Sequence, residues 1–106
     1  MFTVMVSIGR NVGNTPLSDR DWTFFQNDVA DVIRREGEMP EIHTGRGLWA
    51  MVWEDSVHLT VYREFVTEGM RYAYREGLSR LASHYGQDAI ALTISEPELV
   101  SPGRLH

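Results

Sequence analysis

Two amphipathic helical stretches, with strand-like sequence before, between and after them, constrain this chain more than any other feature. In residues 18–35 apolar side chains recur every three or four positions, which places them on one face of a helix. A second stripe with the same spacing runs through residues 67–85, and Gly86 follows it as a stop signal. The first stripe comprises Trp22, Phe25, Val29, Val32 and Ile33, and the second Met70, Tyr74, Leu78, Leu81 and Tyr85.

The ends of both helices are marked by residues that suit them. Ser18 and Thr67 can each accept a hydrogen bond from a backbone N–H of the first helical turn. Acidic residues follow both caps, where the positive end of the helix dipole favours them. Gly37 and Pro40 end the first helix.

The remaining segments have the alternation of β-strands. Residues 2–9 place apolar side chains on every second position, as in a half-buried strand. Residues 41–62 predict two further strands with a turn at Glu54-Asp55, and residues 89–94 predict a short last strand. Residues 9–16 contain two Gly and two Asn, which predicts a loop.

The resulting β-α-β-β-α-β order predicts an α+β, ferredoxin-like sandwich, with two helices on one face of a four-stranded antiparallel sheet. We expect Trp22, Phe25, Tyr74 and Leu81 to meet in one interior. Residues 1–96 would form a single domain, and residues 97–106, with two of the four prolines, a loosely ordered tail.

Composition narrows the function classes. Apolar residues make up 42% of the 106 residues and charged residues 24%, as in globular domains. The net charge of -5 argues against nucleic acid as a partner. The chain has no cysteine, which excludes disulfides and thiol nucleophiles, and it lacks a basic leader or a long apolar run. We therefore expect a cytoplasmic protein that does not enter a membrane.

Three short motifs resemble those of a known family. Ser18 to Trp22 forms a Ser-x-x-x-Trp helix start, Gly47 to Trp49 a Gly-x-Trp strand, and Tyr85 to Gln87 a Tyr-x-Gln ending. Together they resemble a family of small uncharacterised bacterial and actinophage α+β proteins that carry a domain of unknown function. The resemblance implies the same ferredoxin-like order and almost nothing about chemistry, because the family has no established activity. The compact chain, in which every basic residue is Arg and no Cys occurs, suits an actinobacterial phage.

Glycine-rich loops suggest an anion site. Arg10 and Asn11 lie in one such loop and Arg46 lies between Gly45 and Gly47. Glycine lets backbone N–H groups approach an anion, and arginine can bind a phosphate or carboxylate through two hydrogen bonds. Because neither loop matches a known nucleotide-binding motif, the simpler interpretation is ordinary turn chemistry.

The histidines offer weaker candidates. His58 and Thr60 lie on the same face of one strand, in a His-x-Thr pattern known from phosphoesterases that need a second, facing copy. The only other candidate, at His43, lacks the spacing. The four histidines also lack the spacing of metal ligands, so we expect neither a metal nor a cofactor.

The sheet face opposite the helices is sparsely charged and suggests a surface for contact. Its expected members are Thr3, Met5, Ser7, His58, Thr60 and Tyr62. The register of residues 45–54 decides whether Trp49, Met51 and Trp53 join this face, and the sequence leaves that register open.

Three hypotheses follow from these features. The first is a non-enzymatic module that forms a homodimer or binds a protein partner through this face, such as a phage accessory protein that binds a host factor. The alternative is a binder or sponge for a small anionic metabolite or nucleotide that uses Arg10, Asn11 and Arg46. A second alternative is a weak hydrolase centred on His58, with Thr60 beside it.

Overall fold

The computed structural model describes residues 1–49 and 52–103, and within them it shows one four-stranded sheet, one small two-stranded sheet and two helices. The elements in chain order are β1 (Phe2–Gly9), β2 (Asn11–Val12), β3 (Thr15–Pro16), α1 (Asp19–Ile33), β4 (Glu41–Trp49), β5 (Val52–Arg63), α2 (Glu68–His84) and β6 (Ala91–Ser95).

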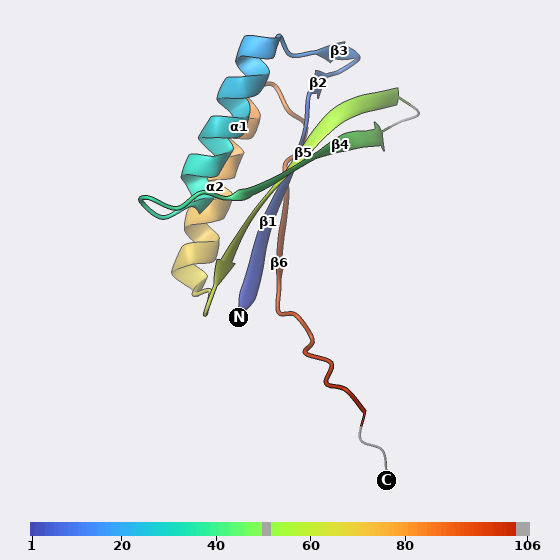
Figure 1. The fold of residues 1–106 in the computed structure, drawn as a ribbon. Coiled ribbons are helices and arrows are strands. Elements are labelled where there is room, and N and C mark those ends of the chain that lie inside the picture. Colours follow the sequence, from blue (N-terminus) through green and yellow to red (C-terminus); the bar gives the residue numbers. More distant parts are fainter. Residues whose placement is uncertain (50–51, 104–106) are drawn as a thin grey trace.

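The four long strands pair in the order β4-β5-β1-β6, and every pairing is antiparallel. Both helices lie side by side on one face of this sheet (Figure 1). Apart from the small β2–β3 hairpin, the element order is β-α-β-β-α-β. The ferredoxin-like α+β sandwich expected from the sequence is therefore confirmed.

The helix caps lie where the sequence places them. The Ser18 hydroxyl accepts a hydrogen bond from the Asp21 N–H at 3.1 Å, and the Thr67 hydroxyl accepts one from the Met70 N–H at 3.1 Å. Gly86 has a φ of 67°, which a side chain would disfavour, and it follows α2 as the sequence predicts.

The core lies between the helices and the sheet. Trp22, Phe25 and Tyr74 are buried there, and Leu81 is partly buried against them, so the expected common interior is present. The sheet contributes the odd-numbered residues of β5 and the even-numbered residues of β1. The buried apolar sheet residues are Val4, Val6, Ile8, Val57, Leu59 and Val61.

The turn expected at Glu54-Asp55 is wrong. Both residues lie inside β5, where Glu54 pairs with Gly47 and Asp55 with Arg46. Their charges are compatible with a strand because each carboxylate has a partner: Glu54 accepts from a backbone N–H and Asp55 lies beside Arg10. The paired part of the β4–β5 hairpin therefore continues past Glu54-Asp55 to Trp49 and Val52, and this end bends away from the helices (Figure 1).

A buried arginine joins the end of α1 to the sheet. Arg63 is 3% exposed, and its guanidinium donates to the Ile33 carbonyl at 2.7 Å and to the Glu38 carboxylate at 2.6 and 2.8 Å. The carbonyls of the last helical turn have no N–H donor within the helix, and Arg63 supplies a donor for one of them. The bidentate contact fixes the α1–β4 connection against β5.

This ion pair predicts acid sensitivity. The hydrogen bonds from Arg63 lower the pKa of Glu38 from 4.5 to about 2. A carboxylate with a depressed folded-state pKa stabilises the fold above its unfolded-state value, and that contribution is lost as the pH falls from about 4.5 towards about 2. Urea midpoints measured between about pH 7 and pH 3 should fall less for Glu38→Gln than for the wild type. Parallel curves for the two proteins would contradict this role.

Beyond β6, residues 96–103 form neither helix nor strand and extend away from the sheet (Figure 1). Leu99 and Val100 in this segment are almost fully exposed. In the described part of the chain, no helix combines the length and apolarity needed to cross a membrane.

Candidate functional site

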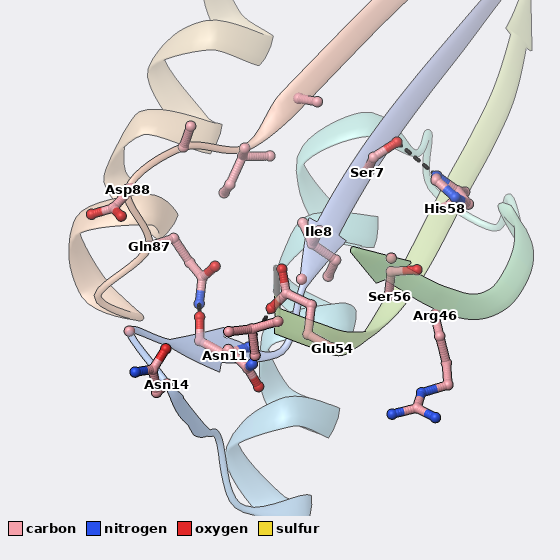
Figure 2. A pocket seen from close by; sticks show the side chains of 17 residues that line it. Ser7, Ile8, Asn11, Asn14, Arg46, Glu54, Ser56, His58, Gln87 and Asp88 are labelled. Atoms are coloured by element: carbon pink, nitrogen blue, oxygen red, sulfur yellow. Dashed lines mark hydrogen bonds between the residues drawn. The ribbon is translucent and has the colours of Figure 1, made fainter. Parts of the chain in front are cut away.

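A pocket of about 580 Å³ lies where the end of β1 meets the β4–β5 hairpin and the α2–β6 connection (Figure 2). Small-molecule sites in proteins have volumes of roughly 300–1,000 Å³. Part of its wall is apolar, from Ile8, Val52, Ala89, Ile90 and Ala91. Its polar lining residues are Ser7, Asn11, Asn14, Arg46, Glu54, Ser56, His58, Gln87 and Asp88.

Glu54 is the carboxylate that the strands hold most firmly in this pocket. Its Oε2 accepts a hydrogen bond from the Asn11 N–H at 2.8 Å. The side chain lies against Gly9, where an added Cβ would collide with the carboxylate group. Gly9 therefore provides the space that Glu54 occupies. Glu54 has no cationic partner within residues 1–49 and 52–103.

Amide side chains lie at the same end of the pocket as Glu54 (Figure 2). The Gln87 amide donates to the Asn11 carbonyl at 3.3 Å and so links the α2–β6 connection to the β2–β3 hairpin. Asn14 lies in that hairpin, next to Gly13, whose φ is 60°. Amides offer both donors and acceptors, so this end can recognise a polar heterocycle or sugar.

Ser7 and His58 form a second polar group on the pocket wall. They are paired directly across β1 and β5, and the Ser7 hydroxyl lies 2.7 Å from His58 Nδ1. Both side chains are half-buried. The pair lies towards the sheet, away from the amide end of the pocket (Figure 2).

The structure separates the three residues expected to bind an anion. Asn11 and Arg46 line the pocket, whereas Arg10 does not. The Arg10 guanidinium donates to the Leu17 carbonyl at 2.7 Å and to Asp19 at 2.6 Å, so it holds the loop to the start of α1. Its role here is structural.

Arg46 lies 5.9 Å above the ring of Trp53, with which it makes a cation–π contact. Strand alternation places Trp53 and Arg46 on the side of the hairpin opposite to Glu54. That settles the register the sequence left open for Trp53; Met51 lies outside the described residues.

The residues expected on the bare sheet face do share it. Register pairs Thr3 with Tyr62, Met5 with Thr60, and Ser7 with His58. The face is not a uniform open surface, because Ser7 and His58 line the pocket and Thr60 is only 7% exposed. Among the described residues, no group of three His, Asp or Glu side chains is arranged to hold a metal ion.

Sequence reasoning missed Glu54 and Gln87 as pocket residues. The Glu54-Asp55 pair predicts a turn, whereas Glu54 lies inside β5 and beside Gly9. Gln87 was noted only as part of a motif. The signal that identifies Glu54 is cross-strand register. Gly9, which has no side chain, pairs with Ser56 of β5, and Glu54 lies two residues from Ser56 on the same face of that strand.

Comparison with known proteins gives one consistent result. No family model matches the chain, and no curated protein matches it in sequence, so the resemblance stated above stays a prediction. Two solved structures of a phage SAM lyase share its fold. One, in complex with S-methyl-5'-thioadenosine, has a TM-score of 0.63 and 19% identity over 90% of this chain and 80% of that chain. The other, in the apo state, has a TM-score of 0.64 and 19% identity over 89% and 78%.

This finding corrects the main functional hypothesis. A non-enzymatic module that dimerises through the sheet face is wrong, because the similar structures are those of an enzyme that binds a small molecule. The pocket occupies one end of that face. The small-ligand alternative agrees better with both observations.

Proposed function

We propose that this protein binds S-adenosylmethionine (SAM) in the pocket and cleaves it without water, releasing S-methyl-5'-thioadenosine. The observation that carries the proposal is a pocket of about 580 Å³ with a carboxylate, Glu54, that has no cationic partner among the described residues. The shared fold with a phage SAM lyase over nine-tenths of the chain supports it, and agrees with the phage source that the sequence suggested.

Charge complementarity supports a cationic substrate. SAM carries a sulfonium, an ammonium and a carboxylate, and therefore one net positive charge. The protein has a net charge of -5, which favours encounter with a cation. Glu54 offers a fixed negative charge inside the pocket, while the amides of Asn11 and Gln87 offer donors and acceptors to the adenosine part.

The apolar wall suits the chemistry of such a cleavage. In SAM the substrate's own carboxylate can attack the Cγ methylene of the methionine part, which is bonded to the sulfonium. A C–O bond forms, the bond between Cγ and sulfur breaks, and its electron pair goes to sulfur. The products are S-methyl-5'-thioadenosine and a five-membered lactone, with no water consumed. The reaction neutralises two opposite charges, so a site that excludes water favours it. Ile8, Val52 and Ile90 give the pocket wall apolar side chains that do not bind water.

The test is incubation of the purified protein with SAM, with products followed by chromatography and mass spectrometry. We expect S-methyl-5'-thioadenosine and the lactone in equal amounts, and thermal stabilisation by S-methyl-5'-thioadenosine through mass action. S-adenosylhomocysteine, a neutral thioether, is the matched control and should remain intact, because its leaving group would be a thiolate. If SAM stays intact and neither SAM nor S-methyl-5'-thioadenosine raises the melting temperature of the protein, the proposal is wrong.

A second candidate function is ligand binding without turnover. The amides of Asn11, Asn14 and Gln87 at one end of the pocket favour it, because they suit a nucleotide as well as SAM. Stabilisation by SAM or a nucleotide with no product in the same incubation would support this candidate over the lyase.

A further inference from the structure

The Ser7–His58 pair has no role in the binding of adenosine described above, yet it lines the same pocket. Its geometry is specific, because cross-strand pairing in β1 and β5 fixes both backbones. When the Ser7 hydroxyl donates to Nδ1, the proton of the neutral imidazole resides on Nε2. Nε2 is then a donor that can serve a ligand.

The position of the pair relative to Glu54 matters. Glu54, Ser56 and His58 alternate along one face of β5, and all three line the pocket. Four residues of strand place the backbones of Glu54 and His58 about 13 Å apart. A SAM molecule bound between these residues, with its adenosine at the amide end, would have its sulfonium on the side of Glu54 and its carboxylate on the side of Ser7 and His58.

Arg46, a cation of the pocket lining, is less suited to the substrate carboxylate. Arg46 rests on Trp53, on the side of the hairpin away from Glu54. Its side chain also points away from Ser7 and His58 (Figure 2). An arginine bound to the substrate carboxylate would in addition make it a weaker nucleophile. A single hydrogen bond from a neutral donor can orient the carboxylate and lowers its nucleophilicity less.

We infer that His58, held by Ser7, donates a hydrogen bond to the carboxylate of SAM and orients it for attack. The inference rests on the proposed function and adds to it a residue that recognises the carboxylate, which the substrate has and S-methyl-5'-thioadenosine lacks. S-methyl-5'-thioadenosine has no carboxylate, so His58 contributes to the binding of SAM and to the reaction but not to the binding of that product.

The test compares two substitutions of His58 with a control substitution of another histidine, His43. His58→Leu removes the donor, and we expect kcat/KM for SAM to fall about tenfold or more, as for loss of a hydrogen bond to a charged group. Affinity for S-methyl-5'-thioadenosine should change less than about twofold, since the contact is absent from that complex. His58→Gln can place an amide N–H near the position of Nε2, and it should recover part of the activity.

His43→Leu is the control, because His43 pairs with His58 across β4 and β5 but is exposed and does not line the pocket. It should retain wild-type kinetics. Affinities for decarboxylated SAM give a second readout: His58→Leu should weaken the binding of SAM and leave that of the decarboxylated compound unchanged.

Each contrary result has a separate meaning. If His58→Leu weakened the binding of SAM and of S-methyl-5'-thioadenosine equally, the inference would be overturned while the proposed function stands. The same holds if Arg46→Met, and not His58→Leu, removed the difference in affinity between SAM and decarboxylated SAM. A wild-type protein that neither binds nor cleaves SAM would overturn both.

Discussion

Glu54→Gln is expected to weaken the binding of SAM by about tenfold or more, because the substitution removes the fixed charge that faces the substrate cation. The glutamine carbonyl can still accept the hydrogen bond from the Asn11 N–H, so the fold should be unaffected. Affinity for the uncharged S-methyl-5'-thioadenosine should fall much less. Isothermal titration with both compounds measures the difference.

The matched control is Glu76→Gln, an exposed residue of α2 that carries the same charge and does not line the pocket. It should bind both compounds as the wild type does. Equal losses of SAM and S-methyl-5'-thioadenosine in Glu54→Gln would instead place Glu54 against the adenosine part that the two share.

Gly9→Ala tests the same prediction without altering the charge of the protein. An added Cβ would collide with the Glu54 carboxylate, which ends a flexible side chain and can move aside. We therefore expect weaker binding of SAM with a folded protein. Gly45→Ala is its control, because the nearest atom to that Cβ is Ser56 Oγ at 3.7 Å, which is ordinary contact. Wild-type affinity in Gly9→Ala would show that the position of Glu54 does not matter.

The fold could be predicted because its local signals agree with one another. Ser18 and Thr67 cap the helices that their apolar stripes define, and the alternation in β1 gives the face that Trp22 and Phe25 cover. Each signal involves residues close in sequence, where propensity and periodicity are informative.

The site was harder to predict because long-range pairing creates it. Glu54 enters the pocket only because Gly9 ends β1 beside it and Asn11 turns its N–H towards it. Charged pairs such as Glu54-Asp55 usually mark turns, and their strand conformation depends on partners far along the chain. The contacts of Arg10 were hard to predict for the same reason, since one of its carboxylate partners, Asp55, lies far along the chain and the other is Asp19.

Arg63→Met is expected to lower the free energy of unfolding by about 3 kcal/mol, near the lower end of the range for removing one partner of a buried ion pair. The lower end applies because Glu38 is 30% exposed and can regain water, whereas the Ile33 carbonyl loses its donor in the interior. A small domain has roughly 5–15 kcal/mol of stability in total, so this loss is a large share of it.

Urea unfolding of three variants separates the ion pair from the carbonyl contact. Arg34→Met removes an exposed pair with Asp31 and should cost less than about 1 kcal/mol. Glu38→Gln removes the charge partner but leaves Arg63 bonded to Ile33, so it should destabilise less than Arg63→Met. If Arg63→Met and Arg34→Met had the same small effect, the end of α1 would not depend on Arg63, and apolar packing of Ile33 alone would hold that helix to the sheet.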